Sequence, residues 1–184
     1  YLKNYKVIVL SSAMSGTTNN LVNMSKKISN NFSAEEYDTL VSAGEQIACS
    51  LLAGQLQELG IKAKSWMAWQ IPILTDGMHK YSRIKYINKS PILNFMKKGG
   101  TPIIAGFQGI NKNFRITTIG RGGTDASAIM FSKFFKADRC VIYTDVEGVY
   151  TTDPNKLKSA KKIKKISYEE MLEMASLGSK VMQP

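Results

Sequence analysis

The sequence has few cysteines and histidines for its length. Its 184 residues include only two cysteines and one histidine. Cys49 and Cys140 both lie in apolar segments, so we expect reduced thiols in the core, one in a long helix and one in a strand. Such thiols suit a cytoplasmic protein. His79 has no obvious partner in the sequence, and we expect it to lie in a loop.

Long apolar runs are absent as well. No run approaches the roughly 18–20 residues that a membrane-spanning helix needs, so we expect no membrane span. The sequence has no signal-peptide pattern, internal repeat or disordered linker, and because it begins at Tyr1 we expect its natural N-terminus to lie upstream. The hydrophobic share of 43% is ordinary for a soluble globular protein, and the length suits one domain.

Acidic residues are scarce relative to basic ones, with 14 Asp and Glu against 25 Lys and Arg, which gives a net charge of +11. Six lysines fall between Lys156 and Lys165, a density that attracts phosphates. This stretch has no interleaved aromatic residues, and no recognition-helix or RNA-binding motif accompanies it. We therefore expect a solvated lysine-rich surface and no nucleic-acid partner.

Apolar patterns predict strands that alternate with helices. Strands are expected over residues 6–10, 63–69, 101–107 and 141–143. Helices are expected over residues 20–28, 33–59, 90–98, 126–135 and 167–176. Ser33 with Glu36, and Ser167 with Glu170, have the spacing of capping boxes. The alternation predicts an α/β fold, a three-layer αβα sandwich around a mainly parallel sheet.

Residues 120–125, Gly-Arg-Gly-Gly-Thr-Asp, form the most informative stretch. It follows an apolar strand and a polar hairpin, and it opens a helix. Its glycines allow an anion to approach the backbone closely, and a helix N-terminus adds unsatisfied donors and a positive dipole end. Arg121 can bind a carboxylate with two parallel hydrogen bonds, while Asp125 adds a negative charge in the same turn. The stretch therefore predicts a ligand site.

Three candidate residues each follow a predicted strand, namely Ser12, Arg121 and Asp145. Ligands of open α/β sheets bind beyond the carboxyl ends of the strands. We therefore expect one crevice to hold all three residues.

Other stretches accompany residues 120–125 in a fixed order. They are Ser42-Ala43-Gly44-Glu45, Ala105-Gly106-Phe107-Gln108-Gly109, residues 143–150 with Thr151-Thr152-Asp153-Pro154, and Gly178-Ser179-Lys180. In order and spacing they closely resemble the catalytic domain of the aspartate kinases, in the amino-acid kinase family. The resemblance runs from the strand at Val7 to Lys180, almost the whole chain.

The resemblance implies phosphoryl transfer from ATP to the side-chain carboxylate of L-aspartate, which gives 4-phospho-L-aspartate and opens the route to lysine, threonine and methionine. It implies ATP as nucleotide, Mg²⁺ held mainly through the phosphates, no protein-held metal site and a homo-oligomer. Catalytic roles fall to Asp125 and Lys180. The implied substrate-binding residues are Thr17, Thr18, Glu45, Arg121, Gly122, Gly123 and Thr124. The implied ATP-binding residues are Ser12, Thr124, Thr144, Asp145, Tyr150, Thr151, Thr152, Asp153, Pro154, Asn155 and Lys180.

The sequence also departs from the pattern of the aspartate kinases. Their first strand carries Lys-Phe/Tyr-Gly-Gly-Thr/Ser-Ser, and nothing like it precedes Lys6. The chain ends at Pro184, before the rest of the kinase domain and the ACT regulatory domains, so we expect one catalytic domain over residues 1–184 that belongs to a longer protein. Thr124 occupies a position at which serine is commoner in the aspartate kinases, and Asn155 occupies one at which arginine is frequent.

Two alternatives stay open from the sequence. One is another amino-acid kinase, such as acetylglutamate, glutamate 5- or uridylate kinase, which shares the ATP side and differs around the acceptor. The other is a noncatalytic fragment that binds nucleotide, a partner chain, or nucleic acid through residues 156–165.

Overall fold

A computed structural model describes residues 4–120, 122–144, 148–152 and 157–176. The chain divides into two compact units, Tyr1–Cys140 and Val141–Pro184.

A parallel three-stranded sheet forms the centre of the first unit. Its order is β1 (Val9–Ser11), β5 (Thr101–Ala105), β2 (Ala63–Trp66), and both pairings are parallel. All five residues of β5 are buried, as expected of a central strand covered on both faces. The strands predicted near residues 6–10, 63–69 and 101–107 are confirmed, with shorter bounds.

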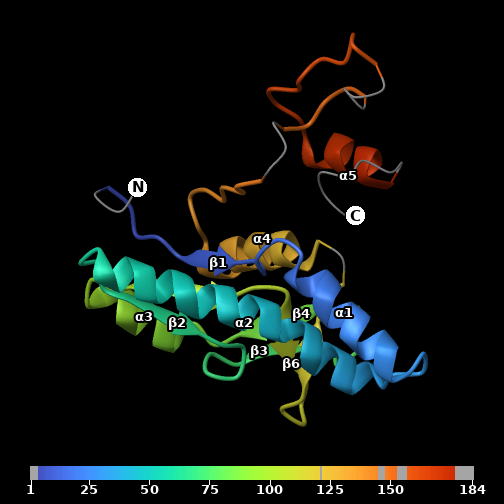
Figure 1. The fold of residues 1–184 in the computed structure, drawn as a ribbon. Coiled ribbons are helices and arrows are strands. Elements are labelled where there is room, and N and C mark those ends of the chain that lie inside the picture. The colour runs from blue at the N-terminus through green and yellow to red at the C-terminus, as the bar shows by residue number, and fades with distance from the viewer. Residues whose placement is uncertain (1–3, 121, 145–147, 153–156, 177–184) are drawn as a thin grey trace. The chain divides into compact units, whose positions relative to one another are not determined.

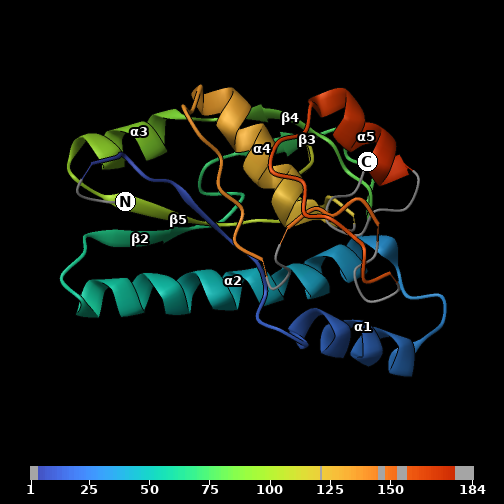
Figure 2. The same ribbon diagram turned by 90° about the horizontal axis from the view of Figure 1, so that it is seen from above.

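Helices cover both faces of this sheet. The long helix α2 (Ala34–Glu58) runs along one face, beside α1 (Thr17–Ile28), while α3 (Ser90–Lys97) and α4 (Gly123–Phe135) lie on the other (Figures 1 and 2). The predicted helices are therefore present, and so is the predicted αβα layering around a mainly parallel sheet.

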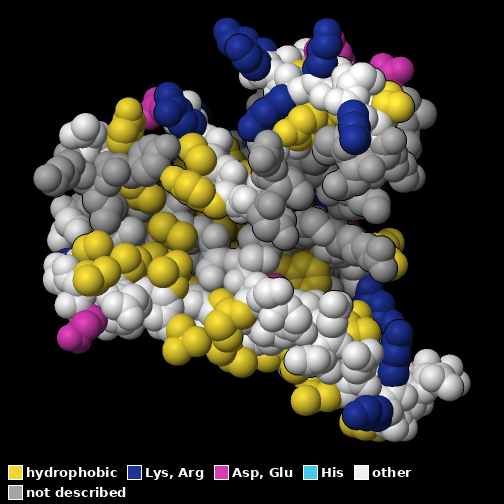
Figure 3. Space-filling model, turned by 45° about the horizontal axis from the view of Figure 1, so that its top comes forward, with side chains coloured by type: hydrophobic (Ala, Val, Ile, Leu, Met, Phe, Trp, Pro, Cys, Tyr) yellow, Lys and Arg dark blue, Asp and Glu magenta, His cyan; other side chains and the backbone are white. Residues whose placement is uncertain are grey.

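The last turn of α1 is basic. Lys and Arg side chains gather at the lower right of Figure 3, the side on which α1 lies in Figures 1 and 2.

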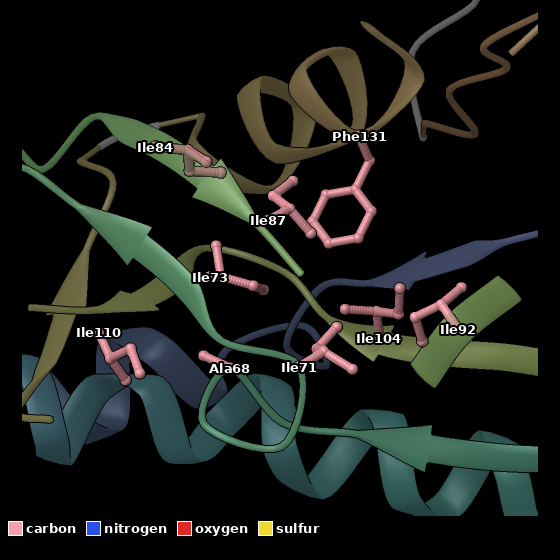
Figure 4. Packing of buried hydrophobic residues seen from close by; sticks show 9 residues of the cluster. All are labelled: Ala68, Ile71, Ile73, Ile84, Ile87, Ile92, Ile104, Ile110 and Phe131. Atoms are coloured by element: carbon pink, nitrogen blue, oxygen red, sulfur yellow. The ribbon is translucent and has the colours of Figure 1, made fainter. Parts of the chain in front are cut away.

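Alternate residues of β5 explain the three layers. Ile103 and Ala105 pack with Cys49 and Ala53 of α2, whereas Ile104 belongs to the core on the opposite face. Figure 4 shows Phe131 pointing from α4 toward Ile87 in that opposite core. Burying a side chain of this size contributes about 1.5–3 kcal/mol. The members of this cluster are Ala68, Ile71, Ile73, Ile84, Ile87, Ile92, Ile104, Ile110 and Phe131.

A second, mixed sheet extends the first unit. Its order is β4 (Ile84–Ile87), β3 (Ile73–Thr75), β6 (Gln108–Ile110), β7 (Ile116–Thr118). β3 pairs with β6 in parallel, and the other two pairings are antiparallel. The hairpin of β6 and β7 is the polar hairpin expected after residues 101–107. Strands β3 and β4 were not expected, because each is short and lacks a clear period.

In the second unit, Tyr150 pairs with Lys162 in an isolated antiparallel bridge, and α5 (Tyr168–Ser176) follows. The predicted capping box of α5 is confirmed: the amide of Glu170 donates to the Ser167 hydroxyl (3.1 Å), and the amide of Ser167 donates to the Glu170 carboxylate (2.8 Å). Gly178, which follows this helix in the sequence, lies outside the described residues.

The predicted strand over residues 141–143 is wrong. Val141, Ile142 and Tyr143 have no strand assignment, and Tyr143 is 80% exposed. A strand needs a neighbour for its backbone donors and acceptors, and no strand in the described part of the chain pairs with these residues. Apolar composition alone does not show whether that neighbour is present.

Three smaller predictions are corrected. Cys49 is buried as expected, but Cys140 is exposed and lies in no strand. His79 lies in a turn, yet it has a partner, since its Nδ1 lies 2.7 Å from the Asp38 carboxylate. Ser33 does precede α2 but makes no side-chain cap; Glu36 pairs with Arg115 of the β6–β7 hairpin instead.

Candidate functional site

A pocket of about 820 Å³ opens in the first unit. Its walls come from the loop after β1, from α1 and α2, from the turn between β3 and β4, and from the start of α4. The lining residues are Ser12, Thr18, Asn19, Val22, Asn23, Lys26, Tyr37, Glu45, Lys80, Tyr81, Phe107, Thr118, Gly120, Gly122, Gly123, Thr124 and Asp125.

The glycine-rich stretch forms the N-terminus of α4 at this pocket. Gly120 and Gly122 have φ angles of 64° and 69°, in the left-handed region that favours glycine, and Gly122 is the N-cap. A Cβ added to Gly123 would lie 2.6 Å from the ring of Phe107, so the close approach requires glycine. The helix start therefore faces the pocket with its positive dipole end, as an anion site requires.

Glu45 brings a buried carboxylate to the same pocket. It lies on the buried stripe of α2 and is only 3% exposed. Its Oε1 accepts a hydrogen bond from the amide of Ala13 (3.2 Å), and its Oε2 has no hydrogen-bond partner among the described residues. Burial raises the pKa of Glu45 from 4.5 to about 7. An unpaired, buried carboxylate oxygen that lines a pocket is suited to receive a cationic group of a ligand.

Two hydroxyls meet where the β1 loop reaches α4. Ser12 Oγ and Thr124 Oγ1 lie 3.3 Å apart, and they come from residues 112 positions apart in the sequence. The approach depends on Gly106, because a Cβ there would lie 2.8 Å from Thr124 Cγ2 and 3.3 Å from the Ser11 carbonyl oxygen. Both hydroxyls line the pocket and are available to hydrogen-bond an oxygen-rich ligand.

Asp125 lies in the first turn of α4 and also lines the pocket. Burial raises the pKa of its carboxyl above the ordinary value. The same carboxylate, together with burial, raises the pKa of the Cys140 thiol. Asp125 is therefore a partly desolvated acid beside the glycine-rich helix start.

Several of the predicted site residues thus come together in one pocket. They are Ser12, Thr18, Glu45, Gly122, Gly123, Thr124 and Asp125. Thr17 is absent from the lining, and its methyl group packs near Gly44. Thr144, Tyr150, Thr151 and Thr152 belong to the second unit, where Thr151 hydrogen-bonds Lys161. Arg121, Asp145, Asp153, Pro154, Asn155 and Lys180 lie outside the described residues.

Outside α1, the sequence did not single out five further lining residues. They are Tyr37, Lys80, Tyr81, Phe107 and Thr118. Phe107 lies inside one of the stretches that carry the resemblance, and only its individual role was missed. The other four meet through contacts between distant segments, which no local period reveals.

The described residues contain neither a membrane-spanning helix nor a cluster of metal ligands. No helix there is long and apolar enough to cross a bilayer. No group of three or more His, Cys, Asp or Glu residues in the same part of the chain is arranged to hold a metal ion.

Comparison with known proteins places these features in a family. A profile described as "Amino acid kinase family" matches residues 1–184. The chain belongs to the amino acid kinase family.

Curated members of this family include relatives of high identity. An aspartokinase of Rickettsia conorii is 50% identical over 185 aligned residues, which cover 99% of this chain and 46% of the relative. An aspartokinase of Geobacillus stearothermophilus is 49% identical, over 99% of this chain and 45% of the relative. The chain thus spans about half the length of the curated relatives it matches.

Solved structures of the family agree with the fold. The aspartate kinase from Synechocystis superposes with a TM-score of 0.80 at 40% identity, over 97% of this chain and 29% of that one. Aspartokinase III of Escherichia coli, in complex with aspartate and ADP, gives a TM-score of 0.79 at 30% identity, over 90% of this chain and 38% of that one. The pocket described above therefore lies in an amino acid kinase fold.

Proposed function

We propose that the protein is an aspartate kinase, which transfers the γ-phosphoryl group of ATP to the side-chain carboxylate of L-aspartate. One carboxylate oxygen forms the new P–O bond, the bond to the β-phosphate oxygen breaks, and ADP leaves. The observation that carries the proposal is the meeting of Glu45 with the Gly122–Asp125 helix start in one pocket. The identity to aspartokinases near 50% supports the same acceptor.

The charged groups of the acceptor would each meet a group of opposite charge. Glu45 would pair with the ammonium group of aspartate through its Oε2, which receives no hydrogen bond from the described residues. Arg121 would hold a carboxylate, and the positive end of α4 at Gly122 and Gly123 would stabilise negative charge on carboxylate or phosphate. Ser12 and Thr124 would hydrogen-bond the oxygens between acceptor and nucleotide.

For the nucleotide, the proposal uses the residues that the resemblance to the aspartate kinases implies. Thr144, Tyr150 and the residues that follow would bind the adenosine, and Lys180 would stabilise the transferring phosphoryl group. Phosphoryl transfer needs positioning and charge neutralisation more than covalent catalysis, and hydroxyl, carboxylate and ammonium groups can provide both. Asp125 would orient the cationic groups around the phosphates.

Magnesium would be held mainly through the phosphates of ATP, as is usual where Mg²⁺ keeps several waters and takes few protein ligands. The ion would neutralise charge on the phosphates. Asp125, the carboxylate at the start of α4, is the residue of this pocket that would help to hold the ion. The homo-oligomer and the cytoplasmic location stay predictions.

An acceptor panel tests the proposal. ADP release by the full-length protein is measured with ATP and L-aspartate, N-acetylglutamate, glutamate or UMP. We expect turnover with L-aspartate and at least about 100-fold lower kcat/KM with the others, because a site built around specific polar contacts rejects ligands that leave them unpaired. Preference for any other acceptor would identify a different member of the family.

A further inference from the structure

Asp38 is a buried carboxylate outside the pocket that joins its own helix α2 to two other segments, the β3–β4 turn and β7, through hydrogen bonds. It lies in α2 and is fully buried. It accepts from the amide of Lys80 at both oxygens (3.1 and 3.0 Å), and from the amide (3.1 Å) and hydroxyl (2.6 Å) of Thr118. His79 Nδ1 lies 2.7 Å from its Oδ2. A buried carboxylate with so many partners ties these segments together.

All three tied segments reach the pocket. Tyr37 precedes this carboxylate in α2, Lys80 and Tyr81 come from the β3–β4 turn, and Thr118 ends β7; all four line the pocket. The turn is also fixed to β7, since the amide of Ser82 donates to the Thr118 carbonyl (2.9 Å). The carboxylate therefore lies behind one wall of the pocket and sets its geometry.

Lys80 is held in an unusual conformation on this wall. Its φ is 69°, a left-handed value that non-glycine residues rarely adopt and that persists only where surrounding contacts enforce it. Its Nζ lies 4.7 Å from the ring centroid of Tyr37. The hydrogen bonds from the Lys80 amide to Asp38 and this cation–π contact together direct the ammonium group along the pocket wall.

The place of Lys80 points to the acceptor end of the pocket. Its carbonyl oxygen would lie 3.3 Å from a Cβ built on Gly120, so the turn packs directly on that glycine. Gly120 immediately precedes Arg121, the proposed carboxylate clamp. The pocket also contains Glu45, so opposite charges face a ligand that itself carries both signs.

We propose that Lys80 binds an anionic carboxylate of the phosphoryl acceptor and that Asp38 is the positioning residue that holds it there. The inference rests on the proposed function and adds a second cation to Arg121 of the glycine-rich stretch. Lys26, the other lysine in the described lining, lies on the exposed last turn of α1 and is not fixed in this way.

Steady-state kinetics of the full-length enzyme with ATP and L-aspartate test the role of Lys80. We expect Lys80→Met to raise the aspartate KM by roughly tenfold or more, with the ATP KM within about twofold, because only the acceptor loses a charge partner. Lys80→Arg keeps the charge and should restore most of the affinity. Lys112→Met, an exposed lysine in the β6–β7 hairpin, is the matched control and should behave like wild type.

The positioning role of Asp38 is tested by a double mutant. Asp38→Asn should raise the aspartate KM in the wild-type background and add little in the Lys80→Met background, whereas a merely structural defect would add in both. If Asp38→Asn does not fold, His79→Gln removes one partner of Asp38 and serves in the same cycle. Circular dichroism checks that each variant is folded.

The outcomes separate the two proposals. An active wild type with an unchanged aspartate KM in Lys80→Met would overturn the assignment of Lys80 alone, and so would a change confined to the ATP KM. A wild-type enzyme that does not phosphorylate aspartate would overturn both the proposed function and this inference.

Discussion

Glu45 is a charged residue in the middle of a helix, and its chemistry depends on the position it takes in the fold. A glutamate in such a helix is normally solvated, but this one lies on the stripe of α2 that faces the sheet and the pocket. Burial raises its pKa to about 7, so near neutral pH the carboxyl must lose its proton before it can pair with an ammonium group. Its neighbours on the buried stripe, Val41, Ser42 and Cys49, show that the helical period alone identifies its face.

The pH dependence of aspartate binding follows from this pKa. Below about pH 7 Glu45 is mostly protonated and cannot form the ion pair, so the aspartate KM should fall up to about tenfold per pH unit as pH rises toward 7 and then level off. The aspartate KM measured from about pH 5.5 to 8.5 checks this. Glu45→Gln should give a high KM that does not change over this range. A constant wild-type KM would contradict the proposed role of Glu45.

The same residue should lower stability at neutral pH. Because its folded pKa is raised, the folded state retains a proton that the unfolded state releases, so stability decreases as pH rises from 4.5 to about 7 and is constant above that. The shift corresponds to about 3 kcal/mol. The free energy of unfolding of Glu45→Gln minus that of wild type should therefore increase by up to about 3 kcal/mol as pH rises from 4.5 to about 7. Urea unfolding at several pH values measures it, and a pH-independent difference would refute it.

At the scale of elements, the sequence predicts helices and buried strands well where a local pattern is long. The helices near α2, α3, α4 and α5 follow from the spacing of their apolar residues, and β5 follows from its apolar run. The two capping-box patterns show the limit. Ser167 and Glu170 form theirs, whereas Glu36 pairs with Arg115 from a hairpin far along the chain. A local pattern does not reveal such a partner.

Two glycines of α2 provide a matched pair of substitutions. In a helix, Gly→Ala normally stabilises by about 0.5–1 kcal/mol. Gly54 has nothing within 4 Å of a built Cβ, so Gly54→Ala should give this gain. A Cβ on Gly44 would lie 2.9 Å from Ala13 Cβ and 3.3 Å from Thr17 Cγ2. Gly44→Ala should therefore destabilise, by about 1–3 kcal/mol.

Chemical unfolding of the two variants measures this difference. Gly44→Ala should also reduce aspartate turnover, because it displaces Ala13, whose amide binds Glu45. Equal stabilisation by both substitutions would mean that the β1 loop does not pack on α2 as described.

At the scale of the whole molecule, the candidate site is a product of long-range contacts. The class of fold follows from the alternation of strands and helices, and the glycine-rich stretch identifies one wall of the pocket. The wall formed by Tyr37, Lys80 and Thr118 does not follow from the sequence, because it is joined through Asp38 across some 80 residues of chain. The same limit explains the wrong strand at residues 141–143, whose backbone partner cannot be read from its own composition.

The most direct test of the central claim is the identity of the product. The full-length protein is incubated with ATP, Mg²⁺, L-aspartate and hydroxylamine, which converts an acyl phosphate into a hydroxamate. The account predicts aspartyl hydroxamate and ADP in equal amounts, formed only when L-aspartate is present. ADP without hydroxamate, or no aspartate-dependent ADP at all, would contradict transfer of a phosphoryl group to the carboxylate of aspartate.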